Sequence, residues 1–315
     1  MAQFVRKVGM ILALAVLAYP ILVILSRYGF GDHRVGAIFQ RNIEYHPHSE
    51  SFAYTRLREA AGAGPVDLLL LGSSHAYRGL DPRIFAAAGV SSFNLGSSSQ
   101  TPVQTDYLLE RYLDQLAPGL VVYDVMPVGL SGDGAEGAAR LIAAELPGAD
   151  PWPLLRQTPR LVVLNGIILH YFDRARGRDP GPEPAAREID TYVGGGYVVR
   201  DTTYREGKGP PPATPFTPRP VQLAALERSL GRLRAAGVKV LLVQSPITAA
   251  HRAAPAERAA FDRLMAGYGD YIDFNGRLPL VDSLHFYDYQ HLRQRGVEIY
   301  NRALIDSLRA RGYVD

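Results

Sequence analysis

The stretch DLLLLGSSHAYRGLDP, residues 67–82, decides how the rest of the chain is interpreted. Its four consecutive leucines are apolar at every position instead of every second one, which is typical of a parallel strand buried on both faces. The run ends on Gly72, Ser73 and Ser74, and open parallel sheets bind ligands just beyond the carboxyl ends of their strands. The stretch therefore predicts either a plain turn after a strand or a serine hydroxyl presented for chemistry.

Strand-like runs of the same kind recur along the chain, at residues 66–72, 91–96, 119–127, 238–246 and 271–276. Helical patterns lie between and after them, at residues 81–89, 102–118, 220–237, 253–269 and 291–312. An alternation of strand and helix favours a parallel central sheet. We therefore expect an α/β fold, a three-layer sandwich around a mostly parallel sheet of about five strands.

The composition excludes several functional classes. The 315 residues include 34 basic and 31 acidic side chains, and the arginines are scattered among acids, so no nucleic acid is expected as a partner. The absence of cysteine excludes disulfides, thiolate catalysis, cysteine-ligated zinc and a lipoprotein anchor. The nearest approach to metal-ligand spacing is HPH at 46–48, so we expect neither a metal nor another cofactor.

The N-terminus carries the strongest targeting signal. Arg6 and Lys7 precede the run Val8–Leu25, which is 18 residues long and has no charge. A membrane-spanning helix needs roughly 17–25 residues, whereas the apolar region of a signal peptide has about 7–15. Basic residues before the run place the N-terminus in the cytoplasm. We expect residues 1–30 to be a membrane anchor and residues 31–315 an extracytoplasmic domain; a cleaved signal peptide is the alternative, because LAVLA offers small residues for cleavage.

Residues 129–220 interrupt the alternation of strands and helices. They contain a helical portion followed by the glycine run TYVGGGYVVRD and the proline cluster GKGPPPATPFTPRP. We interpret the segment as an insertion that folds over one end of the sheet, not as a second domain. The glycine run lacks the spacing of a dinucleotide-binding loop, so no nucleotide is expected.

A serine nucleophile needs a base and a carboxylate that orients the base. The segment VDSLHFYDYQHLRQRGVEIY offers two such pairs, Asp282-x-x-His285 and Asp288-x-x-His291. Both follow the last predicted strand, and His291 leads directly into the last predicted helix. We favour Asp288 and His291 and keep Asp282 and His285 as the alternative. The roles of two other residues near the strand ends remain open. His75 either lines the pocket or is structural, and Asp124 either faces the site or caps a turn.

These motifs resemble the SGNH/GDSL hydrolases, whose nucleophile follows the first strand and whose Asp-x-x-His lies near the C-terminus. The resemblance covers residues 66–127 and 238–312 and rests on GSSH, FNLGSSSQ and DYQHLRQRGVEIY. It implies Ser74 as nucleophile, His291 as base and Asp288 as its orienting carboxylate. It also implies an oxyanion hole formed by the backbone N–H groups of Ser74 and Gly96.

One family block differs. The family's third block supplies an asparagine to the oxyanion hole, but this chain reads YDVMPVGLSGDG there. Three alternatives follow: the hole consists of backbone donors alone, Asn94 or Gln100 substitutes, or activity is reduced or absent. In lacking this asparagine and in having an N-terminal anchor, the chain resembles the membrane-anchored branch of the family. That branch serves teichoic-acid D-alanylation and alginate or peptidoglycan O-acetylation.

That branch implies a serine esterase or acyltransferase at the bacterial inner membrane, facing the periplasm. Its substrates would be acyl esters, above all acetyl esters, of a cell-surface polysaccharide or related glycan. Its partners would be that glycan and a membrane-bound O-acyltransferase. The alternative is a non-catalytic anchored subunit that binds glycan or assists assembly of an acylation complex.

Overall fold

The computed structural model describes residues 1–28, 42–49, 51–200, 202–203, 215–252 and 255–315. A five-stranded sheet lies at its centre in the order β2-β1-β3-β7-β8, and all of its pairings are parallel. Its strands are β1 (Leu68–Leu71), β2 (Ser92–Asn94), β3 (Leu120–Asp124), β7 (Lys239–Gln244) and β8 (Tyr271–Asp273). Each strand falls within one of the five strand-like runs, so the predicted α/β fold is confirmed.

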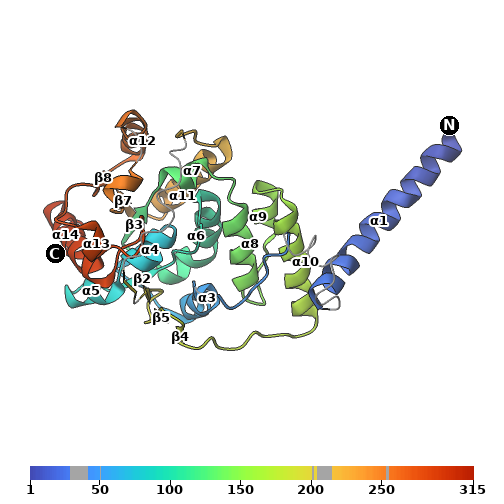
Figure 1. Ribbon diagram of the computed structural model, residues 1–315, viewed down its shortest axis with the longest axis horizontal. Helices are drawn as coiled ribbons and strands as arrows, with labels where there is room; N and C mark the ends of the chain where they lie inside the picture. Colours follow the sequence, from blue (N-terminus) through green and yellow to red (C-terminus); the bar gives the residue numbers. More distant parts are fainter. Residues whose placement is uncertain (29–41, 50, 201, 204–214, 253–254) are drawn as a thin grey trace.

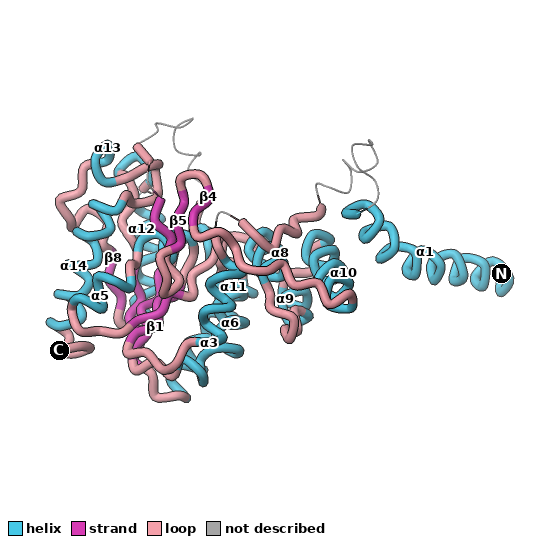
Figure 2. Tube along the Cα trace, turned by 90° about the horizontal axis from the view of Figure 1, so that it is seen from below, coloured by secondary structure: helices cyan, strands magenta, loops and turns pink. Residues whose placement is uncertain are grey.

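Helices surround this sheet, and one of them extends away from the body (Figures 1 and 2). The helices are α1 (Ala2–Tyr28), α3 (Ala53–Gly62), α4 (Ser74–Gly79), α5 (Pro82–Ala87), α6 (Pro102–Leu116), α7 (Pro127–Ser131), α8 (Ala135–Ala144), α9 (Trp152–Gln157), α10 (Leu161–Ala175), α11 (Pro220–Ala235), α12 (Pro255–Tyr268), α13 (Asp282–His285) and α14 (Gln294–Ala310). Of these, the short helices α4, α7 and α13 were not expected, because helices of four to six residues leave no periodic pattern in the sequence.

The leucines of β1 explain why the sheet needs helices on both faces. Leu68 and Leu70 point into a core shared with α5 and α14, whereas Leu69 and Leu71 point into a core shared with α6 and α11. All four are 0 % exposed. Burial of one leucine side chain contributes about 1.5–3 kcal/mol, so this strand is a rigid support for the residues that follow it.

The predicted insertion, residues 129–220, contains α8, α9 and α10. It also holds a second, antiparallel sheet formed by β4 (Ala186–Arg187), β5 (Asp190–Tyr192) and β6 (Val198–Arg200). The glycine run therefore forms the turn between β5 and β6. Strands of two or three residues are too short for a hydrophobic pattern, which is why the sequence does not predict them. Residues 207–214 of the proline cluster lie outside the described residues, and the boundaries of the insertion stay a prediction.

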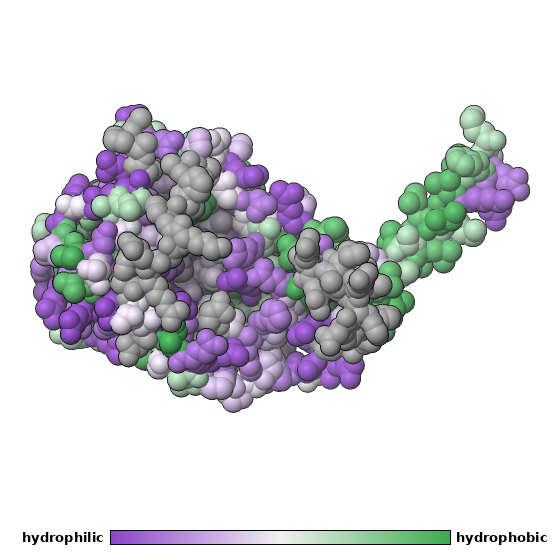
Figure 3. Space-filling model, in the orientation of Figure 1, coloured by the Kyte–Doolittle hydropathy of each residue, from purple (hydrophilic) through white to green (hydrophobic). Residues whose placement is uncertain are grey.

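The helix α1 is long and apolar enough to cross a membrane. An 18-residue window within its segment Ala2–Arg27 has a mean hydropathy of 2.7 and is almost entirely exposed, although a signal sequence passes the same test. Figure 3 shows this helix as a green, apolar rod beside a mostly polar body.

Candidate active site

A sharp turn from β1 into α4 positions Ser74. Gly72 has a φ of +142°, and a Cβ at this position would lie 2.9 Å from both the Cβ and the carbonyl oxygen of Asp124. Only glycine fits this conformation and this close approach. The chain therefore leaves the sheet abruptly, and Ser74 becomes the first residue of α4 at the carboxyl end of β1.

The structure brings Ser74 together with the second Asp-x-x-His pair. Ser74 Oγ lies 2.8 Å from His291 Nε2, and His291 Nδ1 lies 2.8 Å from Asp288 Oδ2. Because a carboxylate only accepts hydrogen bonds, Nδ1 carries the proton and Nε2 accepts from the serine. The arrangement joins a hydroxyl, a base and an orienting carboxylate in one chain of hydrogen bonds.

The loop before α14 holds Asp288 and His291 in this geometry. Asp288 Oδ1 accepts 2.8 Å hydrogen bonds from the backbone N–H groups of Gln290 and His291. Burial raises the pKa of Asp288, but the hydrogen bonds from His291 and from these backbone groups outweigh it, and the pKa lies below the ordinary value. The carboxylate is therefore kept ionised beside the imidazole.

The first Asp-x-x-His pair has a different position. Asp282 and His285 begin and end the short helix α13. The Nδ1 atom of His285 accepts a 2.8 Å hydrogen bond from the backbone N–H of Val281 at an exposed site. The structure therefore places His291, and not His285, against Ser74.

Two aromatic rings stack on the His291 imidazole. The ring centroid of Tyr287 lies 5.4 Å away with an interplanar angle of 7°, and that of His75 lies 5.1 Å away with an angle of 25°. The guanidinium of Arg200 lies 5.2 Å from the centre of the Tyr287 ring. The stack restricts the orientation of the imidazole. The sequence analysis did not single out Tyr287, although its place one residue before Asp288 was a usable signal.

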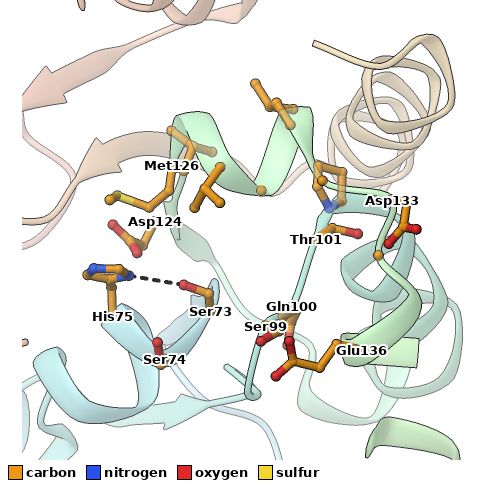
Figure 4. A pocket seen from close by; sticks show the side chains of 18 of the residues that line it. Ser73, Ser74, His75, Ser99, Gln100, Thr101, Asp124, Met126, Asp133 and Glu136 are labelled. Carbon is orange, nitrogen blue, oxygen red and sulfur yellow. Dashed lines mark hydrogen bonds between the residues drawn. The ribbon is translucent and has the colours of Figure 1, made fainter. Parts of the chain in front are cut away.

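His75 is almost fully buried and supports Ser73. Its Nδ1 atom lies 3.2 Å from Ser73 Oγ, as Figure 4 shows. Burial, and next the proximity of His291, lower the pKa of His75 to about 3. The ring is therefore neutral at physiological pH, and it can pack on His291 without adding charge.

Asn94 and Gly96 form part of the scaffold around α4. The amide nitrogen of Asn94 donates to the carbonyl oxygens of Ala76 and Leu80, at 2.8 and 2.9 Å, and its amide oxygen accepts from the Gly96 N–H at 2.9 Å. In this geometry the Gly96 N–H and the Asn94 side chain are bonded to protein atoms. Their assignment to an oxyanion hole stays a prediction.

The remaining expected oxyanion donors differ in their availability. The side chain of Gln100 accepts from Ser97 Oγ and donates to Thr105 Oγ1 at 2.8 and 2.9 Å, but it also lines the pocket beside Ser74. Within the described part of the chain, the backbone N–H of Ser74 has no hydrogen-bond partner. It is the donor closest to the proposed nucleophile.

A pocket of about 300 Å³ opens beside Ser74. Ser73, Ser74 and His75 line one side, and Ser99, Gln100 and the residues before α8 line the other (Figure 4). Where the family block has an asparagine, the wall after β3 consists of Val125, Met126 and Val128, and no asparagine belongs to the described lining. This side of the pocket therefore offers apolar side chains and no side-chain amide among the described lining residues.

Asp124 also lines this pocket at the end of β3. Its Oδ1 atom accepts a 2.9 Å hydrogen bond from the backbone N–H of Ser245, and its buried Oδ2 atom has no partner among the described residues. Burial raises the pKa of Asp124 to about 6. No group of three or more metal-ligating side chains occurs in the described parts of the chain.

No family model and no curated protein matches this chain. Similar solved structures include a GDSL-like lipase from Bacteroides thetaiotaomicron, at 12% identity and a TM-score of 0.41, with 83% of this chain and 99% of that chain covered. A protein from Bacteroides fragilis assigned as an acylhydrolase is 11% identical with a TM-score of 0.41, and 84% of this chain and 97% of that chain are covered.

Proposed function

We propose that this protein is a serine esterase or acyltransferase that uses Ser74, His291 and Asp288. The observation that carries the proposal is the continuous hydrogen-bond chain from Ser74 Oγ through the imidazole to Asp288 Oδ2, with both links at 2.8 Å. Ser74 lies 217 positions before His291 in sequence, yet it meets His291 and Asp288 at the carboxyl end of the sheet, where ligands of such folds bind.

The chemistry follows from the positions of the atoms. As Ser74 Oγ attacks the carbonyl carbon of an acyl ester, His291 Nε2 takes its proton, and Asp288 stabilises the imidazolium through Nδ1–H. The C–O bond to the leaving alcohol breaks, and this alcohol receives the proton from His291. A second hydroxyl, from a glycan or from water, then attacks the acyl-enzyme and releases Ser74.

We propose acyl esters of a cell-surface polysaccharide or related glycan as the substrates, with acetyl esters foremost. The resemblance to envelope-acylating proteins supports this class, and an opening of about 300 Å³ with both hydroxyl and apolar walls suits a sugar ester. A membrane-bound O-acyltransferase is the proposed partner that supplies the acyl group.

We propose that α1 is retained as an anchor in the bacterial inner membrane, with the domain in the periplasm. Tyr19 Oη donates a 2.7 Å hydrogen bond to Asn165 Oδ1, and Val23 is 0 % exposed between α1 and the body. Removal of this helix as a signal peptide would leave Asn165 and the apolar side chain of Leu169 without these contacts. The packing therefore favours retention.

Labelling with a serine-directed fluorophosphonate tests the catalytic proposal. The wild-type protein and a Ser73→Ala control should acquire a covalent adduct on Ser74, and Ser74→Ala should acquire none. Ser73→Ala is a matched control because it removes the neighbouring hydroxyl from the same turn. Labelling of the Ser74→Ala variant to the wild-type extent would refute the assignment.

A second candidate function is a non-catalytic anchored subunit that binds glycan or assists assembly. The observation that favours it is the oxyanion side of the site, where the Gly96 N–H is bonded to Asn94 and the wall after β3 has no amide donor. Loss of one oxyanion donor costs about 10²–10³ in rate. Acetyl-glycan binding by Ser74→Ala with wild-type affinity, and no adduct in the wild type, would support this candidate.

A further inference from the structure

One acidic side chain of the antiparallel sheet β4–β6 is buried among charges that the proposed chemistry does not use. Asp190 of β5 is 2 % exposed. Its Oδ1 atom accepts hydrogen bonds from Arg78 at 2.5 Å and from Arg200 at 2.8 Å, and its Oδ2 atom accepts a second one from Arg200 at 2.6 Å. Burial raises the pKa of Asp190, but the hydrogen bonds from the two arginines outweigh it, and the pKa lies below the ordinary value. The carboxylate is therefore kept ionised between two guanidinium groups.

The two arginines come from different parts of the fold and lead to different members of the triad. Arg78 belongs to α4 and lies four residues, about one helical turn, after Ser74. Arg200 belongs to β6, and its guanidinium lies 5.2 Å from the centre of the Tyr287 ring, which stacks on His291. One carboxylate therefore joins the helix of the nucleophile to the ring beside the base.

Other contacts already attach this antiparallel sheet to the body. Tyr197 and Val198 are each 1 % exposed and belong to hydrophobic clusters of the body. The backbone N–H of Asn94 in β2 donates a 2.8 Å hydrogen bond to the carbonyl oxygen of Gly195, and Figure 1 shows β5 next to β2. The desolvation of a buried ion pair offsets much of the attraction between its charges, so such a pair is weak evidence for stability. A role in geometry accounts for Asp190 better than a role in attachment.

We propose that Asp190 is a positioning residue for the catalytic triad. By holding Arg78 it fixes the helix of the nucleophile, and by holding Arg200 it keeps the Tyr287 ring against His291. The sheet β4–β6 is thereby part of the catalytic apparatus. This inference rests on the proposed function, because it takes the triad proposed above as the reacting groups.

The rate and the final extent of fluorophosphonate labelling separate positioning from stabilisation. The full-length wild type and its variants are labelled in detergent micelles under identical conditions. The final extent counts the folded sites, and the rate reports the alignment of Ser74 with His291. Asp190→Asn keeps the shape of the side chain and removes its charge. Arg200→Met is the second variant, because the Arg200 side chain is 25 % exposed and its replacement leaves Asp190 paired with Arg78.

Arg187→Met is the matched control from the same sheet. The Arg187 side chain is 38 % exposed and pairs at 3.9 Å with Glu183. Within the described part of the chain, Glu183 bonds to Ser49 and Thr55 and to no member of the triad. The labelling rate of this variant should stay within about twofold of the wild type, as for a surface substitution away from the site.

We expect Asp190→Asn and Arg200→Met to label to the wild-type extent at rates about tenfold lower or less, because a misplacement of about 1 Å costs up to about 10² in rate. For p-nitrophenyl acetate, kcat should fall by more than KM changes. A wild-type labelling rate in either variant would overturn the proposal. So would a reduced extent at an unchanged rate, which shows stabilisation alone, or an equal loss of rate in Arg187→Met.

Two further outcomes are separated by the same experiment. Where Asp190→Asn yields no folded protein, the rate of Arg200→Met decides by the same criteria. An absence of labelling in the wild type would refute the triad and the positioning role together, whereas a labelled wild type with variants of equal rate would refute the positioning role only.

Discussion

Replacement of Asp288 by asparagine tests the role of the carboxylate with little change in shape. The variant keeps an oxygen at Oδ1 for the two backbone N–H groups that Asp288 accepts at 2.8 Å. At the other position an NH₂ group replaces Oδ2 and faces His291 Nδ1 at 2.8 Å. Two donors cannot share one hydrogen bond, so Nδ1 must give up its proton and Nε2 must hold one toward Ser74.

In this tautomer the imidazole cannot accept the serine proton. The corresponding change in Ser-His-Asp enzymes lowers kcat by about 10⁴, which is about 5 kcal/mol of activation free energy. The folded state should be less affected, because both backbone hydrogen bonds remain. The measurement is the rate of p-nitrophenyl acetate hydrolysis, together with the rate of fluorophosphonate labelling at Ser74.

Asp282→Asn is the matched control, since Asp282 has the same spacing to His285 but lies in α13. Its activity should stay within about twofold of the wild type, as for surface substitutions away from a site. Retention of a tenth or more of wild-type activity by Asp288→Asn would refute the reasoning. So would a large loss in Asp282→Asn, because it would transfer the carboxylate role to the first pair.

Three further substitutions report on the turn and the ring stack. Gly72→Ala should lower the free energy of unfolding by about 2–4 kcal/mol in urea titrations, because the backbone has a φ of +142° and the new Cβ would lie 2.9 Å from Asp124; an unchanged midpoint would contradict this. His75→Phe should reduce the acid sensitivity of the fold. The pKa of His75 is about 3 in the folded state and 6.5 in the unfolded state. As the pH falls, the unfolded state therefore binds more protons than the folded state. Through this residue alone, the free energy of unfolding of the wild type should fall by about 2 kcal/mol between pH 7 and pH 5. An equal loss of unfolding free energy between pH 7 and pH 5 in urea titrations of His75→Phe would argue against this role of His75. Tyr287→Ala should lower kcat about tenfold through loss of the stack on His291, and Tyr287→Phe, which keeps the ring, should restore the rate; equal rates in both variants would refute a positioning role.

The parts of the structure that depend on local pattern follow from the sequence. The leucines at 68–71 form one uninterrupted apolar run, and such a run is informative without knowledge of its neighbours. Ser74 and His291 lie 217 residues apart, yet both follow strands of one parallel sheet, and strand ends meet at one edge. Position relative to the strands placed both near one edge of the sheet, but it did not distinguish His291 from His285; the resemblance implied His291.

Other features depend on contacts that no local pattern records. The rings of Tyr287 and His75 come from different segments and stack on His291 only after the sheet has formed. The strands β4 to β6 contain two or three residues each, which is below the length at which alternation becomes recognisable. The sequence offered Asn94 as one of several alternative oxyanion donors, because a polar residue at a strand end has the same appearance whether it faces substrate or scaffold.

The position of Asn94 changes how the oxyanion side of the site is understood. Its three hydrogen bonds, at 2.8, 2.9 and 2.9 Å, join the end of β2 to the carbonyl oxygens of Ala76 and Leu80 and to the Gly96 N–H. Ala76 lies in α4, the helix that begins at Ser74, so the amide holds the nucleophile's helix against the sheet. A buried amide with these partners cannot turn toward substrate without leaving several polar groups unpaired, at about 1–3 kcal/mol each. Asn94 therefore holds in place the helix that begins at Ser74, and we predict that stabilisation of an oxyanion falls to backbone N–H groups, that of Ser74 first among them.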